Sequence, residues 1–172
     1  MPLFLKILSG LTLVSLAVVL VNAQGNANFS GTWILDKSQS DVSQLMGISE
    51  GSENLRDASM TMVIEQQGTS LKVTRILKAS REERKEIHTY KTDGSETTNT
   101  GFRGETVVAR AFWEGDKLAV VSTRTLRVLL KDITVESRGV WNLSPDGQIL
   151  TIAAQVNSPR GEQRVRAVFD KQ

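Results

Sequence analysis

The sequence contains no cysteine, and its 172 residues include only three prolines, one histidine and one tyrosine. The absence of cysteine excludes a disulfide framework, a thiolate metal site and a lipid-anchored lipoprotein. A single histidine leaves only carboxylates and carbonyls as further ligands, so we expect no transition-metal centre and no cofactor. Aromatic residues make up 5 % of the chain and are dispersed, which argues against a base-stacking platform. The formal net charge of +2 indicates neither nucleic acid nor an anionic membrane as a partner.

Long apolar runs are also scarce, and the main one lies at the N-terminus. Lys6 supplies a positive charge, residues 7–21 are mostly apolar, and Ala23 ends a site of small residues. This order is typical of a secretory signal. A membrane anchor is the alternative, but spanning a bilayer takes about 20 apolar residues. We therefore expect residues 1–23 to be a signal peptide, cleaved after Ala23 or Ala27, and the protein to be periplasmic or secreted without stable membrane insertion.

Residues 24–172 are predicted to form one domain, because their number suits a single core and no repeat or linker interrupts them. Short runs rich in β-branched and apolar residues alternate with Gly, Asp and Ser, which is typical of an all-β chain. The runs predict about ten strands, at residues 29–35, 59–66, 70–78, 84–91, 95–100, 105–113, 117–130, 132–143, 148–157 and 162–171.

Most of the predicted connections are short turns, and short turns join antiparallel neighbours. In Ser144-Pro145-Asp146-Gly147 the proline fixes φ and the glycine supplies a positive φ. Asp93-Gly94 predicts a two-residue hairpin between residues 84–91 and 95–100. An open meander would expose two edges, whereas closure removes them. We therefore predict an antiparallel up-and-down β-barrel.

The long polar connection at residues 36–58 is the exception to this pattern. Residues 41–46 and 53–56 each fit a helical turn. Long loops in compact domains are often functional lids, so we expect a loop or short-helix lid after the first strand. A mobile loop rich in Ser and Gly is the alternative.

The run Phe29-Ser30-Gly31-Thr32-Trp33 resembles the opening of the calycin superfamily. Lipocalins carry Gly-x-Trp on their first strand, and intracellular fatty-acid-binding proteins begin with Phe-x-Gly-Thr-Trp. The layout most resembles small secreted bacterial lipocalin-like proteins, with the lid and meander of a fatty-acid-binding protein. In such a barrel Gly31 would let the strand bend, and Trp33 would fill the narrow end while its N–H bonds a carbonyl.

The last predicted strand departs from the fatty-acid-binding pattern. That family often holds a ligand carboxylate with Arg-x-Tyr, whereas this chain has Arg164-Val165-Arg166 and no tyrosine in the required place. Arg164 and Arg166 share one face of the strand. They remain candidate contacts for an anionic group.

Arg124 is a third candidate, because it interrupts the most apolar strand on the face of Leu118 and Val120. An arginine inside a barrel would need a partner, which could be Glu105, Glu136 or the acidic head of a ligand. An outward arginine lying over apolar neighbours is the alternative. Arg127 falls on the opposite face of the same strand.

Other candidate residues have plain structural alternatives. Met60 and Met62 suit an adaptable ligand pocket, although core packing explains methionine equally well. Glu86, His88 and Tyr90 share one face of a strand and could form an acid–base cluster. Because they follow the charged residues 81–85, we favour a polar outer face for them. Residues 47–51 match G-x-S-x-G, but without the strand and helix of a nucleophile elbow.

The sequence therefore predicts an exported, non-catalytic barrel that binds a small apolar molecule, with an anionic group on that molecule as an option. A structural or interaction module of the cell envelope, with a filled core, is the alternative. A barrel enzyme using Glu86, His88 or Tyr90 is less favoured, and it fails if those side chains point into solvent. The volume of the barrel interior distinguishes the first two hypotheses.

Overall fold

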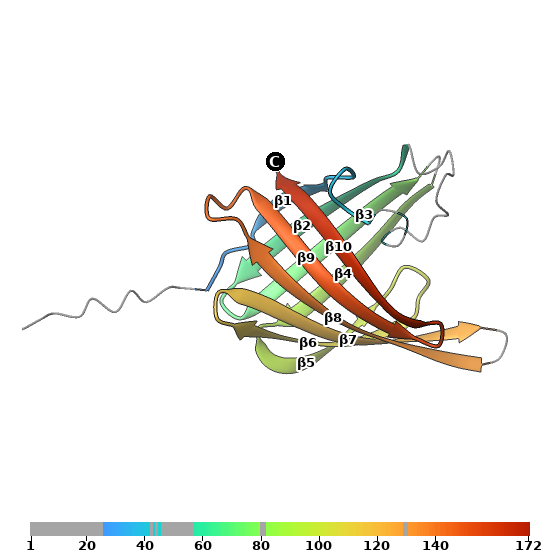
Figure 1. The fold of residues 1–172 in the computed structure, drawn as a ribbon. Helices are drawn as coiled ribbons and strands as arrows, with labels where there is room; N and C mark the ends of the chain where they lie inside the picture. Colours follow the sequence, from blue (N-terminus) through green and yellow to red (C-terminus); the bar gives the residue numbers. More distant parts are fainter. Residues whose placement is uncertain (1–25, 42, 44, 46–56, 80–81, 129–130) are drawn as a thin grey trace, which may run out of the picture.

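A computed structural model describes residues 26–41, 43, 45, 57–79, 82–128 and 131–172. Its ten strands are all antiparallel and form one sheet in the order β4-β3-β2-β1-β10-β9-β8-β7-β6-β5, curled into a nearly closed barrel (Figure 1). This confirms the predicted all-β up-and-down barrel of about ten strands. The expected signal peptide at residues 1–23 and the G-x-S-x-G match at 47–51 lie outside the described residues.

The strand bounds lie close to those predicted from the sequence. The strands are β1 Gly31–Leu35, β2 Ser59–Gln67, β3 Ser70–Ala79, β4 Glu82–Lys91, β5 Asp93–Thr100, β6 Thr106–Glu114, β7 Lys117–Val128, β8 Lys131–Leu143, β9 Ile149–Ser158 and β10 Gly161–Lys171.

The sheet curls into a barrel because the first strand pairs with the last. β1 pairs with β2 on one side and with β10 on the other, so that Trp33 lies opposite both Met62 and Lys171. Most other neighbouring strands are joined by short turns; the one at residues 144–147 takes the predicted form, with φ of 68° at Gly147. Because successive side chains alternate across a strand, one face of every strand points into the barrel.

The predicted hairpin at Asp93-Gly94 is wrong, because β4 and β5 are the two ends of the sheet and no ladder joins them. A bulge between Asp93 and Glu96 shifts the register of β5 on β6, and bulges bend a strand away from its course. Across the gap, the side-chain amide of Asn99 accepts the N–H of Thr89 at 2.7 Å and donates to its carbonyl at 3.1 Å.

One end of the barrel is filled by aromatic rings. Trp33 is fully buried and its Nε1–H donates to the carbonyl of Phe29 at 2.9 Å. Phe29 stacks on Trp113 at 5.8 Å between ring centroids and meets Trp141 edge-on at 5.9 Å. Gly31 has a φ of +143°, a backbone conformation that residues with a side chain rarely adopt, so this position favours glycine.

The segment after β1 runs beside β10 and then reaches the barrel interior. The carboxylate of Asp41 accepts the N–H of Arg166 at 2.6 Å, and the hydroxyl of Ser40 accepts that of Val168 at 2.9 Å. Leu45 N–H donates to the Asp41 carbonyl at 3.0 Å, the spacing of a helical turn, and Leu45 packs against the core. The predicted turn at residues 41–46 is therefore present in its described part. Among the described residues, no helix is long and apolar enough to cross a membrane.

Candidate functional site

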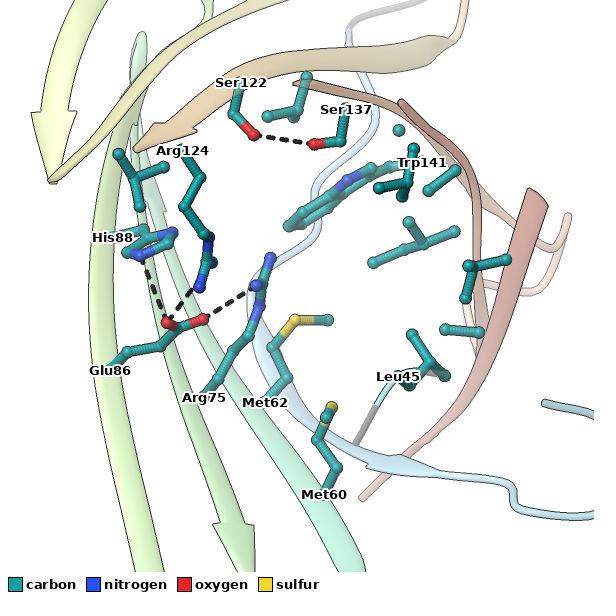
Figure 2. A pocket seen from close by; sticks show the side chains of 18 of the residues that line it. Leu45, Met60, Met62, Arg75, Glu86, His88, Ser122, Arg124, Ser137 and Trp141 are labelled. Atoms are coloured by element: carbon teal, nitrogen blue, oxygen red, sulfur yellow. Dashed lines mark hydrogen bonds and ion pairs between the residues drawn. The ribbon is translucent and has the colours of Figure 1, made fainter. Parts of the chain in front are cut away.

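The barrel encloses a cavity of about 390 Å³, which lies within the range typical of small-molecule sites (Figure 2). Most of its wall is apolar and comes from the inner faces of β2 and β6 to β10. Met60 and Met62 line it from β2, and Leu45 lines it from the segment after β1. The barrel is thus hollow, with an apolar wall that can accept an apolar molecule.

One side of the cavity is polar, and strand register explains why. In the β3–β4 ladder Arg75 lies opposite Glu86, Val73 opposite His88 and Leu71 opposite Tyr90. All three β4 residues are therefore on the inner face, with exposed fractions of 4 % for Glu86, 3 % for His88 and 3 % for Tyr90.

The expectation of a polar outer face for these three residues is therefore wrong. The usual pattern is inverted on this strand, since Ile87 points outward and is 46 % exposed while its polar neighbours point inward. The charged residues at the start of the strand suggested that its polar face is external, and composition alone could not show the inversion.

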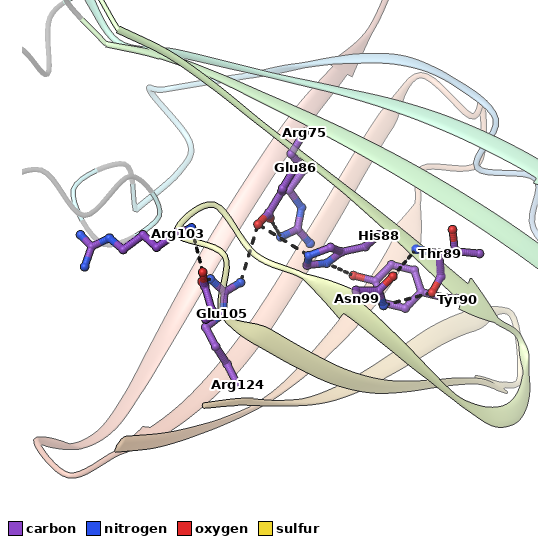
Figure 3. A network of polar contacts seen from close by, with 9 residues as sticks. All are labelled: Arg75, Glu86, His88, Thr89, Tyr90, Asn99, Arg103, Glu105 and Arg124. Carbon is purple, nitrogen blue, oxygen red and sulfur yellow. Dashed lines mark hydrogen bonds and ion pairs between the residues drawn. The ribbon is translucent and has the colours of Figure 1, made fainter. Parts of the chain in front are cut away.

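Two ion pairs neutralise the charges on this wall. Arg75 Nη1 lies 3.0 Å from Glu86 Oε1, and Arg124 pairs with Glu105 (Figure 3). Arg124 Nη2 also lies 3.9 Å from Glu86 Oε2. Glu105 was one of the three partners expected for an inward Arg124, whereas Arg127 on the opposite face is largely exposed.

The loop between β5 and β6 holds the Glu105 carboxylate in place. The N–H of Arg103 donates to Glu105 Oε2 at 2.8 Å, and that of Gly101 donates to the Glu105 carbonyl at 2.9 Å. A side chain at Gly101 would overlap the carboxylate, so glycine leaves the space that the carboxylate fills. Burial opposes its ionisation, but the backbone N–H groups of Glu105 and Arg103, together with Arg124, hold the pKa of Glu105 below its usual range.

His88 and Tyr90 continue the polar wall without adding charge. The Tyr90 hydroxyl lies 3.0 Å from His88 Nδ1. Burial lowers the pKa of His88, as do Arg75 and Arg124, whereas Glu86 and, less strongly, the Thr100 backbone raise it. Burial also raises the pKa of Tyr90. At neutral pH both rings are therefore uncharged.

Arg75 completes the network, and sequence reasoning did not single it out. Burial opposes its charge, but Tyr90 and Glu86 raise the pKa of Arg75, so the guanidinium stays protonated. The sequence held a signal for it, because Arg75 interrupts the apolar series Leu71, Val73 and Leu77 on one face of the strand. Within the described residues, no group of three or more His, Asp or Glu is arranged to hold a metal ion.

Arg164 and Arg166 do not reach the cavity. Both point outward from β10, while Val165 and Ala167 between and beside them line the interior. The two arginines border a separate depression on the outer surface, together with Asp41 and Arg138. Of the three arginines proposed from the sequence, the structure therefore places only Arg124 on the cavity wall.

This protein resembles known proteins in structure but not in sequence. No family model matches the sequence, and no curated protein matches it. The structure is similar to zebrafish ileal bile acid-binding protein complexed with cholic acid, with a TM-score of 0.57 and 17 % identity over 84 % of this chain and 98 % of that one. It is also similar to a Schistosoma mansoni fatty acid binding protein in complex with arachidonic acid, with a TM-score of 0.51 and 15 % identity over 84 % and 96 %.

A third similar structure is secretory abundant heat soluble protein 4 from Ramazzottius varieornatus, with a TM-score of 0.55 and 13 % identity over 87 % of this chain and 99 % of that one. This chain has the fold of the fatty-acid-binding proteins. The calycin resemblance of Phe29-Ser30-Gly31-Thr32-Trp33 is therefore confirmed at the level of the fold. Identities this low establish a shared fold and nothing about the ligand.

Within this fatty-acid-binding-protein fold, the internal ion pairs predict a contrast between two arginines of β7. Arg124→Met leaves the Glu105 carboxylate, which is 6 % exposed, without its guanidinium partner. We expect a loss of about 2–3 kcal/mol in the free energy of unfolding, measured by urea denaturation. Arg127→Met removes an exposed pair with Asp132 and should cost less than about 0.5 kcal/mol. Equal losses in the two variants would contradict an internal role for Arg124.

The lowered pKa of His88 predicts a pH dependence of stability. In the unfolded chain, His88 has the ordinary pKa of about 6.5. At a pH just below that value, the unfolded state therefore binds more protons than the folded state. The free energy of unfolding should hold steady above about pH 7 and fall below about pH 6.5, by up to about 1.4 kcal/mol per pH unit.

Because His88 is the chain's one histidine, the variant His88→Gln is the matched control. Urea unfolding of this variant between pH 7 and pH 5.5 should show little slope. A slope equal to that of the unmodified protein would show that another group causes it.

Proposed function

We propose that the protein is a non-catalytic binding protein that holds a small apolar molecule inside its barrel. The observation that carries this proposal is the cavity of about 390 Å³, with an apolar wall and a few polar groups on one side. A module with a filled core would lack this space. The fold shared with proteins whose structures contain cholic acid and arachidonic acid supports the same function.

The option of an anionic ligand, raised by Arg124, is not part of the proposal. Arg75 and Arg124 are each paired with a carboxylate, and among the described residues no further cation lines the cavity. An anion would therefore approach two buried carboxylates without gaining an unpaired cation. We propose instead a ligand that is apolar along most of its length and carries no negative charge.

Uptake of the neutral dye Nile red, followed by fluorescence, tests the proposal on two neighbouring residues of β9. Ala154 lines the cavity and Ala153 is exposed on the outer face. Ala154→Phe fills part of the cavity and should weaken dye binding by at least about tenfold, whereas Ala153→Phe should bind like the unmodified protein. If the unmodified protein takes up no dye, or if the two variants bind alike, the cavity is not a ligand site.

The inward position of Glu86, His88 and Tyr90 favours acid–base chemistry as a second candidate function. A buried imidazole that is hydrogen-bonded to a phenol and lies beside a carboxylate is suited to proton transfer with a bound molecule. Binding ranks first because the cavity alone supports it, whereas catalysis also requires a reacting group placed at these residues.

We further propose that binding takes place outside the cytoplasm, in the periplasm or the medium. This rests on residues 1–23, with their charged start, apolar middle and small-residue end. Mass spectrometry of the protein isolated from its own host should find Gln24 or Asn28 at the N-terminus. An intact chain that begins at residue 1 or 2 would contradict export by a cleaved signal.

A further inference from the structure

Two buried polar atoms on the cavity wall have no hydrogen-bond partner among the described residues: Glu86 Oε2 and His88 Nε2. The side chains that carry them are 2 % and 3 % exposed. Leaving a buried polar atom unpaired costs about 1–3 kcal/mol, so each such atom calls for an explanation. Both belong to residues that line the cavity, which makes a bound molecule a natural partner (Figure 2).

The distance between the two atoms is 3.6 Å, which is too long for a direct hydrogen bond. Both atoms are covered in this arrangement, so an oxygen atom from the cavity can lie about 2.8 Å from both only after the half-buried side chains beside them, Arg75 and Arg124, move aside. With that shift, the pair forms a two-point site for one small group.

The hydrogen positions at this site follow from the surrounding contacts. The neutral His88 ring can accept the Tyr90 hydroxyl proton at Nδ1, at a distance of 3.0 Å, which leaves the ring hydrogen on Nε2. The neighbouring Glu86 carboxylate favours that tautomer, because it attracts the hydrogen on Nε2. The site then offers one donor, at Nε2, and one acceptor, at Oε2.

A hydroxyl group matches this pattern, because its oxygen accepts from Nε2–H while its hydrogen is donated to the carboxylate. A carboxylate ligand has no hydrogen to donate and would repel Glu86 Oε2. An ammonium ligand cannot accept from Nε2–H and would approach Arg75 and Arg124. A hydroxyl can also replace a water molecule here without leaving either atom unpaired.

We propose that the cavity binds an apolar molecule with a hydroxyl head, the oxygen of which bridges Glu86 Oε2 and His88 Nε2. This inference rests on the proposed binding function and specifies the chemistry of its ligand. The charges of the wall are already balanced by the Arg75–Glu86 and Arg124–Glu105 pairs. The two unpaired atoms therefore call for a neutral group that both donates and accepts a hydrogen bond, and not for a further charge.

Displacement of Nile red by four ligands that share a twelve-carbon chain tests this inference on the unmodified protein at pH 7.5. The ligands are dodecan-1-ol, its methyl ether, dodecanoate and dodecylamine. We expect the alcohol to bind about tenfold more tightly than the ether, which accepts but cannot donate, and to exceed both charged ligands by at least as much. The ether controls for the general affinity of neutral molecules.

A variant pair then assigns the preference to the bridging atoms. Glu86→Gln removes the charged acceptor and should abolish most of the roughly tenfold preference for the alcohol over its methyl ether, a comparison of two neutral ligands that the freed charge of Arg75 does not bias. Glu65→Gln is the matched control, because Glu65 is an exposed carboxylate on β2 that pairs with Lys72 outside the barrel. It should leave the preference unchanged.

The outcomes separate this inference from the function on which it rests. Failure of the protein to bind Nile red overturns both. Dye binding with an alcohol no tighter than the ether, or weaker than dodecanoate, overturns the hydroxyl site and leaves the apolar binding function standing. If Glu86→Gln does not fold, the ligand series on the unmodified protein decides the question alone.

Discussion

Pairing between the first and last strands is the interaction on which the rest of the molecule depends. β1 is short, yet it hydrogen-bonds to β2 on one edge and to β10 on the other, and so joins two halves of a meander into one curved wall. Without that junction, the inner faces of the strands would be one side of an open sheet. With it, they surround a cavity that is partly shielded from bulk water.

Burial of two carboxylates sets the conditions for the polar wall. The side chains of Glu86 and Glu105 are almost fully buried and poorly solvated, so each needs a cationic partner at short range. The cross-strand pair of Arg75 with Glu86 and the loop-held pair of Arg124 with Glu105 meet this need from four different strands or loops. An apolar wall would be easier to stabilise than two buried ion pairs. Their presence in a mostly apolar interior therefore indicates that this side of the barrel has a role in function.

The sequence predicted much of the fold and less of the site. Ten strands, their approximate bounds and the closed meander follow from alternation and turn chemistry, which are local properties. The gap between β4 and β5 could not be predicted in this way, because the bulge near Asp93 depends on how β5 lies against β6. The aromatic end of the barrel likewise brings together Phe29, Trp113 and Trp141, which are far apart in the sequence.

Face assignment explains the errors in the site. Alternation shows that Glu86, His88 and Tyr90 share a face, and that Arg164 and Arg166 share another, but it does not show which face is internal. For β4 the polar face is internal, and for β10 the arginine face is external. Pairing β4 with β3 would have settled the first case, because it places Glu86 opposite Arg75 in an apolar stripe.

The gap between β4 and β5 is bridged by the side-chain amide of Asn99 and not by a ladder. Elsewhere, separating two neighbouring strands means breaking a ladder of backbone hydrogen bonds. Here the side chain of Asn99 holds the backbone of Thr89 by two hydrogen bonds. A barrel with a seam of this kind can widen on one side while its ladders stay intact. The strand that would move carries His88 and Tyr90 on its inner face, so such breathing would change the shape of the cavity at its polar end first.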